Sequence, residues 1–177
     1  MKKENNWYII TGAPSSGKST LLNFLKEKGY KTVQEAARSY IDEQIVQGLT
    51  INEIRRDEEK FQEKILERKM DWESKASPEE LIFWERGVPD TEAYCKLHGF
   101  KITEKLKKAL ANCVYKKVFL LDLVTFKEDY ARTETPEEQR KLQQFLKKSY
   151  TDLGFEVVRV PIFETKKERL NFVLNNL

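Results

Sequence analysis

The feature that most constrains this chain is a short loop sequence that fits the pattern G-x-x-x-x-G-K-[ST]. It consists of Gly12, Ala13, Pro14, Ser15, Ser16, Gly17, Lys18, Ser19 and Thr20. An apolar, β-prone run precedes it at residues 7–11, and leucines at helical spacing follow it, so we expect the loop to join a buried strand to a helix. Glycines let such a loop curl until its N–H groups face phosphate oxygens, and the helix dipole adds positive potential there. The pattern favours a nucleoside triphosphate site over a chance glycine-rich turn.

Two side chains of this loop have expected roles in that site. Lys18 would supply a mobile positive charge for the β- and γ-phosphates, and the Ser19 hydroxyl is placed to hold Mg²⁺. The sequence therefore predicts ATP or a similar nucleotide, together with magnesium, as the cofactors.

Composition narrows the class of protein further. The 177 residues carry 32 Lys and Arg against 29 Asp and Glu, an excess of three positive charges that is too small to argue for nucleic acid. Two cysteines and one histidine have no metal-ligand spacing, and no apolar run approaches the length of a membrane span. We expect a single domain over residues 1–177, located in the cytoplasm, with reduced cysteines.

Apolar runs and helix signals alternate along the chain. Strands are expected at residues 7–11, 31–33, 81–84, 118–121 and 155–160, the second of them near a sheet edge. Helices are expected from the phosphate loop to about residue 28, over 35–46, from 50 to about 74 with Met70 on its apolar stripe, from Asp90 as a cap, and from Thr103, Thr135 and Thr165. This order predicts an α/β fold with a mostly parallel sheet and its ligand at the carboxyl ends of the strands.

Charged residues follow three of the predicted strands at that edge. Glu35 is a candidate general base, with a helix-start carboxylate as the alternative. Glu85 is a candidate to hold Mg²⁺ directly or through water, and the alternative is a capping or ion-pair carboxylate. Arg86 suits recognition of an anionic group. Asp122, after the fourth strand, competes with Glu85 for the metal role.

A charged stretch at residues 130–140 has the composition expected of a lid. Closure of this lid would bring Arg132 onto the transferring phosphoryl group. The alternative is a solvated loop with surface ion pairs, and this alternative is favoured more for Arg140 than for Arg132. Phe126 stands where a guanine-reading N-K-x-D motif would need asparagine, so that kind of GTP selectivity is unsupported.

These motifs together resemble the nucleoside and nucleotide kinase branch of the P-loop proteins. More closely, they resemble the AAA-type predicted ATPase domains related to the ribosylnicotinamide kinase part of bacterial NAD-regulator proteins. The segments that carry the resemblance are residues 12–20, 35–38, 85–90, 93–94, 132–134 and 150–157.

The resemblance implies a three-layer P-loop NTPase sandwich with helices on both faces of a five-stranded parallel sheet in the order 2-3-1-4-5. It also implies an arginine-containing lid and adenine held by the loop after the fifth strand. By position in deoxynucleoside kinases, the roles of base, metal and phosphate contact would fall to Glu35, Glu85 and Arg86. The chain departs from those kinases at Gly87, where their Glu-Arg-Ser motif has serine, and the long helix shows no recognisable base-reading pattern.

We therefore expect a phosphotransferase that moves the γ-phosphoryl group of ATP to a small acceptor such as a nucleoside, a nucleotide or a related metabolite. The alternative is an ATPase or nucleotide-gated switch that acts with a protein partner. A kinase acting on polynucleotide ends is not favoured by the weak charge bias, and a homodimer is left open.

Overall fold

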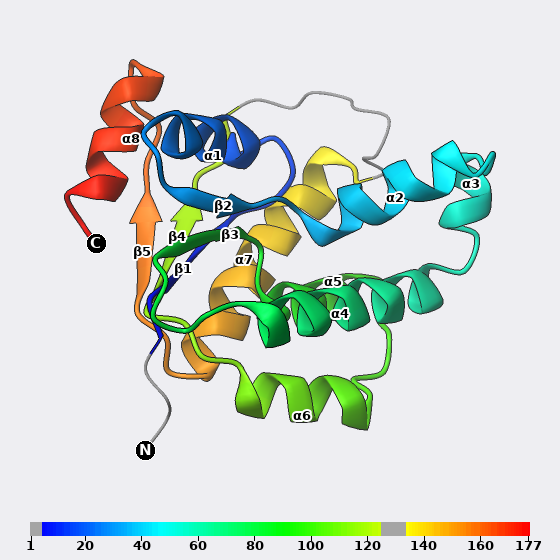
Figure 1. Cartoon of the computed structure of the whole chain (residues 1–177). Coiled ribbons are helices and arrows are strands. Elements are labelled where there is room, and N and C mark those ends of the chain that lie inside the picture. Colours follow the sequence, from blue (N-terminus) through cyan, green and yellow to red (C-terminus); the bar gives the residue numbers. More distant parts are fainter. Residues whose placement is uncertain (1–4, 125–133) are drawn as a thin grey trace.

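The chain folds around a five-stranded sheet, which Figure 1 shows at the centre of the molecule. The structure is a computed structural model, and it describes residues 5–124 and 134–177. The strands are β1 (Trp7–Thr11), β2 (Lys31–Val33), β3 (Ile82–Glu85), β4 (Lys117–Leu121) and β5 (Val157–Val160). All neighbouring pairs are parallel, and the order is β2-β3-β1-β4-β5. This confirms the predicted sheet and the edge position of the short second strand.

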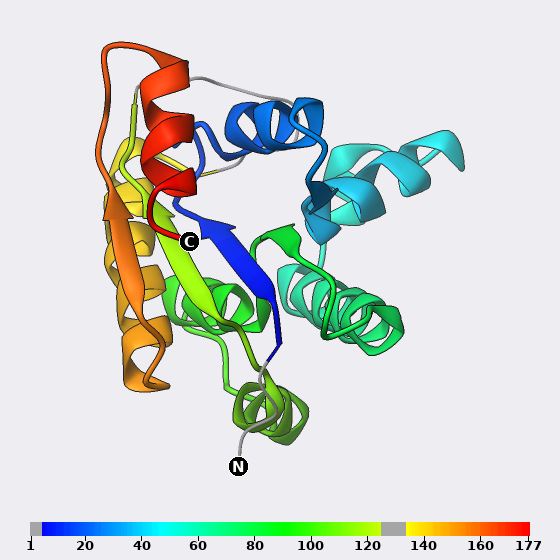
Figure 2. The ribbon, with the colours of Figure 1, turned by 60° about the vertical axis from the view of Figure 1, so that its left-hand side comes forward.

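Helices cover both faces of the sheet (Figures 1 and 2). On one face lie α1 (Lys18–Glu27) and α8 (Lys166–Leu174). The other face is covered by α4 (Glu58–Lys75), α5 (Val88–His98) and α7 (Pro136–Asp152), with α6 (Glu104–Asn112) packed against α5. The two remaining helices, α2 (Ala36–Val46) and α3 (Ile51–Ile54), extend from the β2 edge, and α2 packs on α4.

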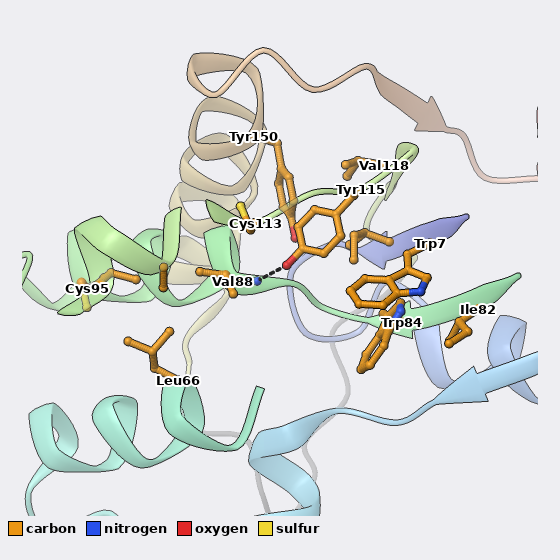
Figure 3. Close-up of a cluster of buried hydrophobic side chains, with 13 residues drawn as sticks. Trp7, Leu66, Ile82, Trp84, Val88, Cys95, Cys113, Tyr115, Val118 and Tyr150 are labelled. Carbon is orange, nitrogen blue, oxygen red and sulfur yellow. Dashed lines mark hydrogen bonds between the residues drawn. The ribbon is translucent and has the colours of Figure 1, made fainter. Parts of the chain in front are cut away.

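The central strand divides its side chains between two cores. Tyr8 and Ile10 of β1 pack with residues of α1 and α8, whereas Trp7 and Ile9 face the cluster drawn in Figure 3. Because alternate residues of a strand point to opposite faces, a strand covered on both sides must be apolar throughout. In the second cluster the rings of Trp7 and Trp84 lie 5.3 Å apart.

Several predicted helix starts are confirmed. Thr50, Thr103, Thr135 and Thr165 each accept a hydrogen bond from a backbone N–H three residues later, and three of the four complete a capping box. None of the helices in the described parts of the chain has the length and apolar character needed to span a membrane.

Three sequence predictions about helices were wrong. The helix expected over residues 50–74 is two helices, because the carboxylate of Asp57 caps a new start by accepting from the Lys60 N–H at 3.1 Å. Met70 is 38% exposed and lies off the apolar stripe. Asp90 does not occupy the cap position of α5: that position is Gly87, and the Asp90 carboxylate reaches back to the Gly87 N–H. The fifth strand also begins two residues later than expected, at Val157.

Candidate active site

The phosphate-loop sequence joins β1 to α1 at the carboxyl edge of the sheet, as predicted. Gly12 has φ +147°, and a Cβ atom there would lie 2.6 Å from Ser16 Oγ and 2.7 Å from the Leu121 carbonyl oxygen. Only glycine fits this turn, because both the backbone angle and the space exclude a side chain. Gly17, in the left-handed conformation, occupies the cap position before α1.

Two side chains that are distant in sequence, Arg169 and Gln143, hold the loop in place by hydrogen bonds. The Arg169 guanidinium of α8 donates to the Ser16 carbonyl at 2.6 Å and to the Asp122 carbonyl at 3.0 Å. The Gln143 amide of α7 accepts from the Ala13 N–H at 2.8 Å and donates to the Leu121 carbonyl at 2.9 Å. These contacts tie the loop to the ends of β4 and β5, and neither residue had been singled out in the sequence.

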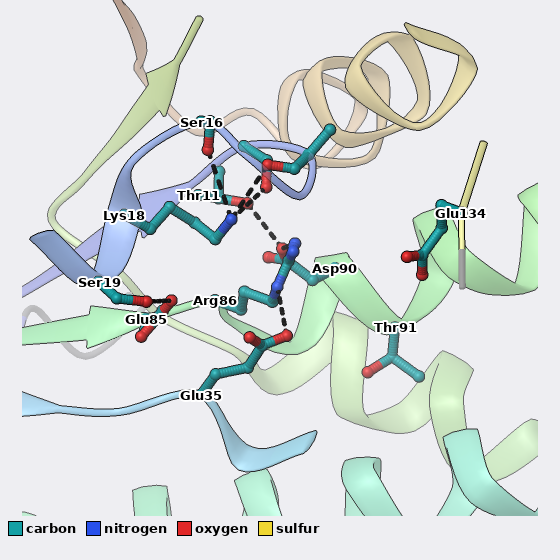
Figure 4. A network of polar contacts seen from close by, with 12 residues as sticks. Thr11, Ser16, Lys18, Ser19, Glu35, Glu85, Arg86, Asp90, Thr91 and Glu134 are labelled. Atoms are coloured by element: carbon teal, nitrogen blue, oxygen red, sulfur yellow. Dashed lines mark hydrogen bonds and ion pairs between the residues drawn. The ribbon is translucent and has the colours of Figure 1, made fainter. Parts of the chain in front are cut away.

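Lys18 points back into its own loop. Its amine donates to the carbonyls of Gly12 at 2.9 Å and Ala13 at 3.1 Å, as Figure 4 shows. Burial lowers the pKa of this amine to about 7, and the nearby positive charge of Arg86 contributes in the same direction. An amine in this position can exchange neutral carbonyl oxygens for phosphate oxygens of much higher charge.

Ser19 and Glu85 lie together beside it. The Ser19 hydroxyl donates to the Glu85 carboxylate at 3.0 Å, and Glu85 is the last residue of β3. Burial raises the pKa of Glu85, and the negative charge of Glu35 raises it further. A hydroxyl and a carboxylate are the hard oxygen ligands that Mg²⁺ takes alongside nucleotide phosphates and water, so these residues fit that ion.

Asp122, the other candidate for the metal role, is paired with Arg159. The carboxylate of Asp122 accepts two hydrogen bonds from the Arg159 Nε–H and a third from Nη2, at 2.8–3.0 Å, and no contact joins it to Ser19 in the described residues. Of the two carboxylates, Glu85 is the one that contacts Ser19.

Arg86 is held by two carboxylates. Its Nε–H donates to Glu35 at 2.8 Å and its Nη1 donates to Asp90 at 2.9 Å, while the guanidinium lies 5.3 Å from the ring centre of Tyr94. The backbone of Arg86 has φ +66°, a conformation that a non-glycine residue adopts at a cost of about 1–3 kcal/mol. This turn points the guanidinium into the site.

Glu35 is the cap residue of α2, two residues after β2; its side chain makes no capping hydrogen bond and faces the same space. Burial alone would raise the pKa of its carboxyl, but the charges of Arg86 and Lys18 outweigh that effect and hold the pKa below its ordinary value. Glu35 is therefore ionised at neutral pH, as a proton acceptor must be.

Asp90 is the buried centre of this network. It accepts hydrogen bonds from the Thr11 hydroxyl at 2.6 Å, the Gly87 N–H at 3.0 Å, the Arg86 guanidinium and the Tyr150 hydroxyl. Burial opposes its charge, yet Arg86 and the other partners hold the pKa of Asp90 below its ordinary value. Its two oxygens each accept two bonds, so the carboxylate is fully used and is a positioning group.

Gly87 is required by packing against two tyrosines. A Cβ atom at Gly87 would lie 2.9 Å from the ring and hydroxyl of Tyr115 and 2.9 Å from the hydroxyl of Tyr150. This close approach gives the physical reason for the departure from the Glu-Arg-Ser motif.

A cleft of about 130 Å³ connects these groups. It brings together Lys18, Ser19, Glu35, Glu85 and Arg86, which the sequence had placed at three separate strand ends. The far side of the cleft is lined by Ile41, Phe61, Gln62, Ile65, Lys69 and Tyr94.

A second hollow of about 400 Å³ lies on the other side of the phosphate loop. Apolar side chains from α1 and from the loop after β5 line it, among them Phe24, Ile162 and Phe163. Arg132 lies outside the described residues, as do residues 130, 131 and 133 of the predicted lid; the rest of that stretch leads into α7, where Arg140 is exposed.

The comparisons with known proteins agree with this fold. A family model described as an AAA domain matches residues 7–169, so the chain belongs to this AAA domain family. The sheet order, with helices on both faces, matches the P-loop NTPase fold. Among curated proteins, no match was found.

Solved structures with the same fold include three kinds of protein. NadR protein, solved in complex with NR, has a TM-score of 0.71 and 16% identity, over 97% of this chain and 48% of that one, so this chain spans about half of its length. Deoxyadenosine kinase from M. mycoides, solved with dCMP and a flexible dCDP, has a TM-score of 0.70 and 15% identity over 96% and 97% of the two chains. Thymidylate kinase from Ehrlichia chaffeensis has a TM-score of 0.69 and 12% identity over 98% of each chain.

The buried network predicts a pH-dependent cost for Asp90→Asn. The free energy of unfolding of the variant should be about 3–5 kcal/mol lower than that of wild type at pH 7, because Arg86 and three other donors lose a charged acceptor. The pKa of Asp90 is lower in the folded than in the unfolded protein. The contribution of its charge to the free energy of unfolding is therefore complete above the unfolded pKa of about 3.9, and it is lost as the pH falls through the folded pKa. Urea unfolding from pH 7 to pH 3 should therefore show the difference from wild type narrowing below about pH 4.

Asp71→Asn is the matched control, since Asp71 forms an exposed ion pair with Lys75 and should cost no more than about 0.5 kcal/mol. A difference for Asp90→Asn that is absent at pH 7, or that stays constant into acid, would contradict the assignment.

Proposed function

We propose that this protein transfers the γ-phosphoryl group of ATP to a hydroxyl of a small acceptor, with Mg²⁺ as the metal. The observation that carries the proposal is the arrangement across one cleft. The phosphate loop with Lys18 forms one wall, the Glu35 carboxylate faces it, and the cleft continues between side chains that include Phe61 and Ile65. A nucleotide site alone would not need an ionised carboxylate held in that place.

Phosphoryl transfer depends mainly on positioning and on charge stabilisation. The Lys18 amine would leave the loop carbonyls and bind the β- and γ-phosphates. Ser19 and Glu85 would hold Mg²⁺, which would neutralise negative charge on the phosphate oxygens. The second hollow, beside the loop after β5, would take the nucleotide base.

The acceptor would enter from the α4 side of the cleft. Glu35 would take the proton of its hydroxyl as that oxygen attacks the γ-phosphorus, while the bond to the β-phosphate oxygen breaks and ADP leaves. Arg86 would hold Glu35 in place and stabilise the transferring group from the same side. Arg132, outside the described residues, remains a predicted contributor of further positive charge.

The kinase proposal predicts that ATP consumption depends on the acceptor. Wild-type protein should hydrolyse ATP slowly alone and consume it much faster with a suitable member of a metabolite library, because the acceptor's binding energy completes the site. Coupled ADP release would measure this, and Lys18→Ala should abolish it while the far-UV circular dichroism stays unchanged. Vigorous hydrolysis that no small molecule alters, but a protein partner does, would favour the nucleotide-gated switch instead.

A second prediction separates the two interpretations of Glu35. Glu35→Gln should reduce phosphoryl transfer by about 10²–10⁴-fold, the usual contribution of a general base, with little change in nucleotide affinity. Single-turnover transfer and equilibrium binding of Mg·AMP-PNP measure the two quantities separately. Glu43→Gln, which alters an exposed carboxylate of α2, the helix that follows Glu35, is the control. If Glu35→Gln changed only stability, by up to ~1 kcal/mol, Glu35 would be a helix-start carboxylate.

A further inference from the structure

Lys69 is a buried lysine in the wall of the acceptor cleft. It belongs to α4, it is 5% exposed, and its amine donates to the Gly87 carbonyl at 2.8 Å and to the Thr91 hydroxyl at 3.3 Å. Figure 4 shows Thr91 on α5 below the Arg86–Asp90 pair. Both partners of the amine are therefore neutral oxygens.

This environment differs from that of Arg86 and Arg55, two of the arginines that line the same cleft. Arg86 pairs with Glu35 and Asp90, and Arg55 pairs with Glu58 at 2.8 Å. No carboxylate oxygen of the described residues lies within ion-pair distance, 4.0 Å, of the Lys69 amine. Burial lowers the pKa of Lys69, and the nearby Arg86 charge adds to this, although the negative charges of Asp90, Glu35 and Glu73 oppose it. A cation removed from water without a charged partner is costly to the folded protein.

The position of Lys69 on α4 places its charge beside the acceptor space. Phe61, Ile65 and Lys69 follow one another at four-residue spacing, so they lie on one face of the helix, and all three line the cleft. Ile41 of α2 and Tyr94 of α5 complete the apolar lining. An acceptor that packs on these apolar groups would bring one of its ends to the amine.

We propose that the acceptor carries an oxyanion, a carboxylate or a phosphate, and that the Lys69 amine binds it. An ammonium group has three donors, and Gly87 and Thr91 take two of them, which leaves one for the ligand. This inference rests on the proposed function and makes it narrower: the substrate is an anionic small molecule, and Lys69 is the residue that selects it over a neutral analogue.

Matched pairs of candidate acceptors test the inference by binding. One arm compares thymidine and cytidine with their 5′-monophosphates, and the other compares sugar alcohols with the corresponding sugar acids. Titration calorimetry uses the whole chain saturated with Mg·AMP-PNP, so that the phosphate loop is already occupied. At least one anionic member should bind ten-fold or more tightly than its neutral partner, and the arm in which this occurs distinguishes phosphate from carboxylate.

Lys69→Gln should reduce the affinity ratio of anionic to neutral member at least ten-fold while leaving Mg·AMP-PNP affinity unchanged. Lys69→Arg, which keeps the positive charge, should retain most of that ratio. Lys64→Gln, which changes an exposed lysine of the same helix, should have no effect. As the pH rises, the preference for the anionic member should decrease at a lower pH than it would with a solvent-exposed lysine, because the pKa of Lys69 is lowered.

Equal binding of neutral and anionic members, failure of every anionic member to bind, or a preference that survives Lys69→Gln would overturn the inference. A variant that weakened both members of a pair equally would also overturn it, because that is the result of a purely structural contact. Failure of the proposed function looks different, since ligands would then bind without any transfer of phosphate.

Discussion

The buried carboxylate of Asp90 is the interaction on which the site depends. Through Thr11 it reaches the end of β1, through Arg86 and Gly87 the turn after β3, and through Tyr150 the helix α7. Such a charge is tolerated in the interior only because four donors compensate for its lost hydration. The same four bonds fix where the phosphate-loop strand, the arginine turn and α7 sit relative to one another.

Charge balance then determines what each acidic side chain can do. Glu35 and Glu85 lie in one cleft, yet positive neighbours lower the pKa of Glu35, while burial and its negative neighbour raise that of Glu85. Separation of this kind assigns different roles to similar groups. Glu35 stays ionised, as the proposed role of proton acceptor requires, whereas a nearby cation would lower the raised pKa of Glu85. The left-handed backbone of Arg86 directs its guanidinium into the cleft, where Glu35 and Asp90 accept its hydrogen bonds.

How far the sequence predicts this arrangement depends on the range of the interactions. The loop at residues 12–20 has a local pattern, and Glu35, Glu85 and Arg86 were found because strand ends of a parallel sheet meet at one edge. The bonds from Thr11 to Asp90 and from Arg169 to Ser16 span 79 and 153 residues, and no local pattern encodes such pairings. The break before α4 did have a signal, because Asp57 with two glutamates in the next turn is a typical helix start.

The most direct test of the account is proton uptake when the nucleotide binds, since the central claim is that Lys18 exchanges loop carbonyls for phosphates. Burial lowers the pKa of the amine to about 7, and bound phosphates would raise that pKa and draw in a proton at pH 8. Calorimetry of Mg·AMP-PNP binding at pH 8, in buffers of different ionisation enthalpy, measures the uptake. Lys18→Arg is the reference, since its guanidinium stays charged and the nucleotide's own proton exchange cancels. The account predicts that wild type takes up more protons than Lys18→Arg; equal uptake in the two proteins would contradict it.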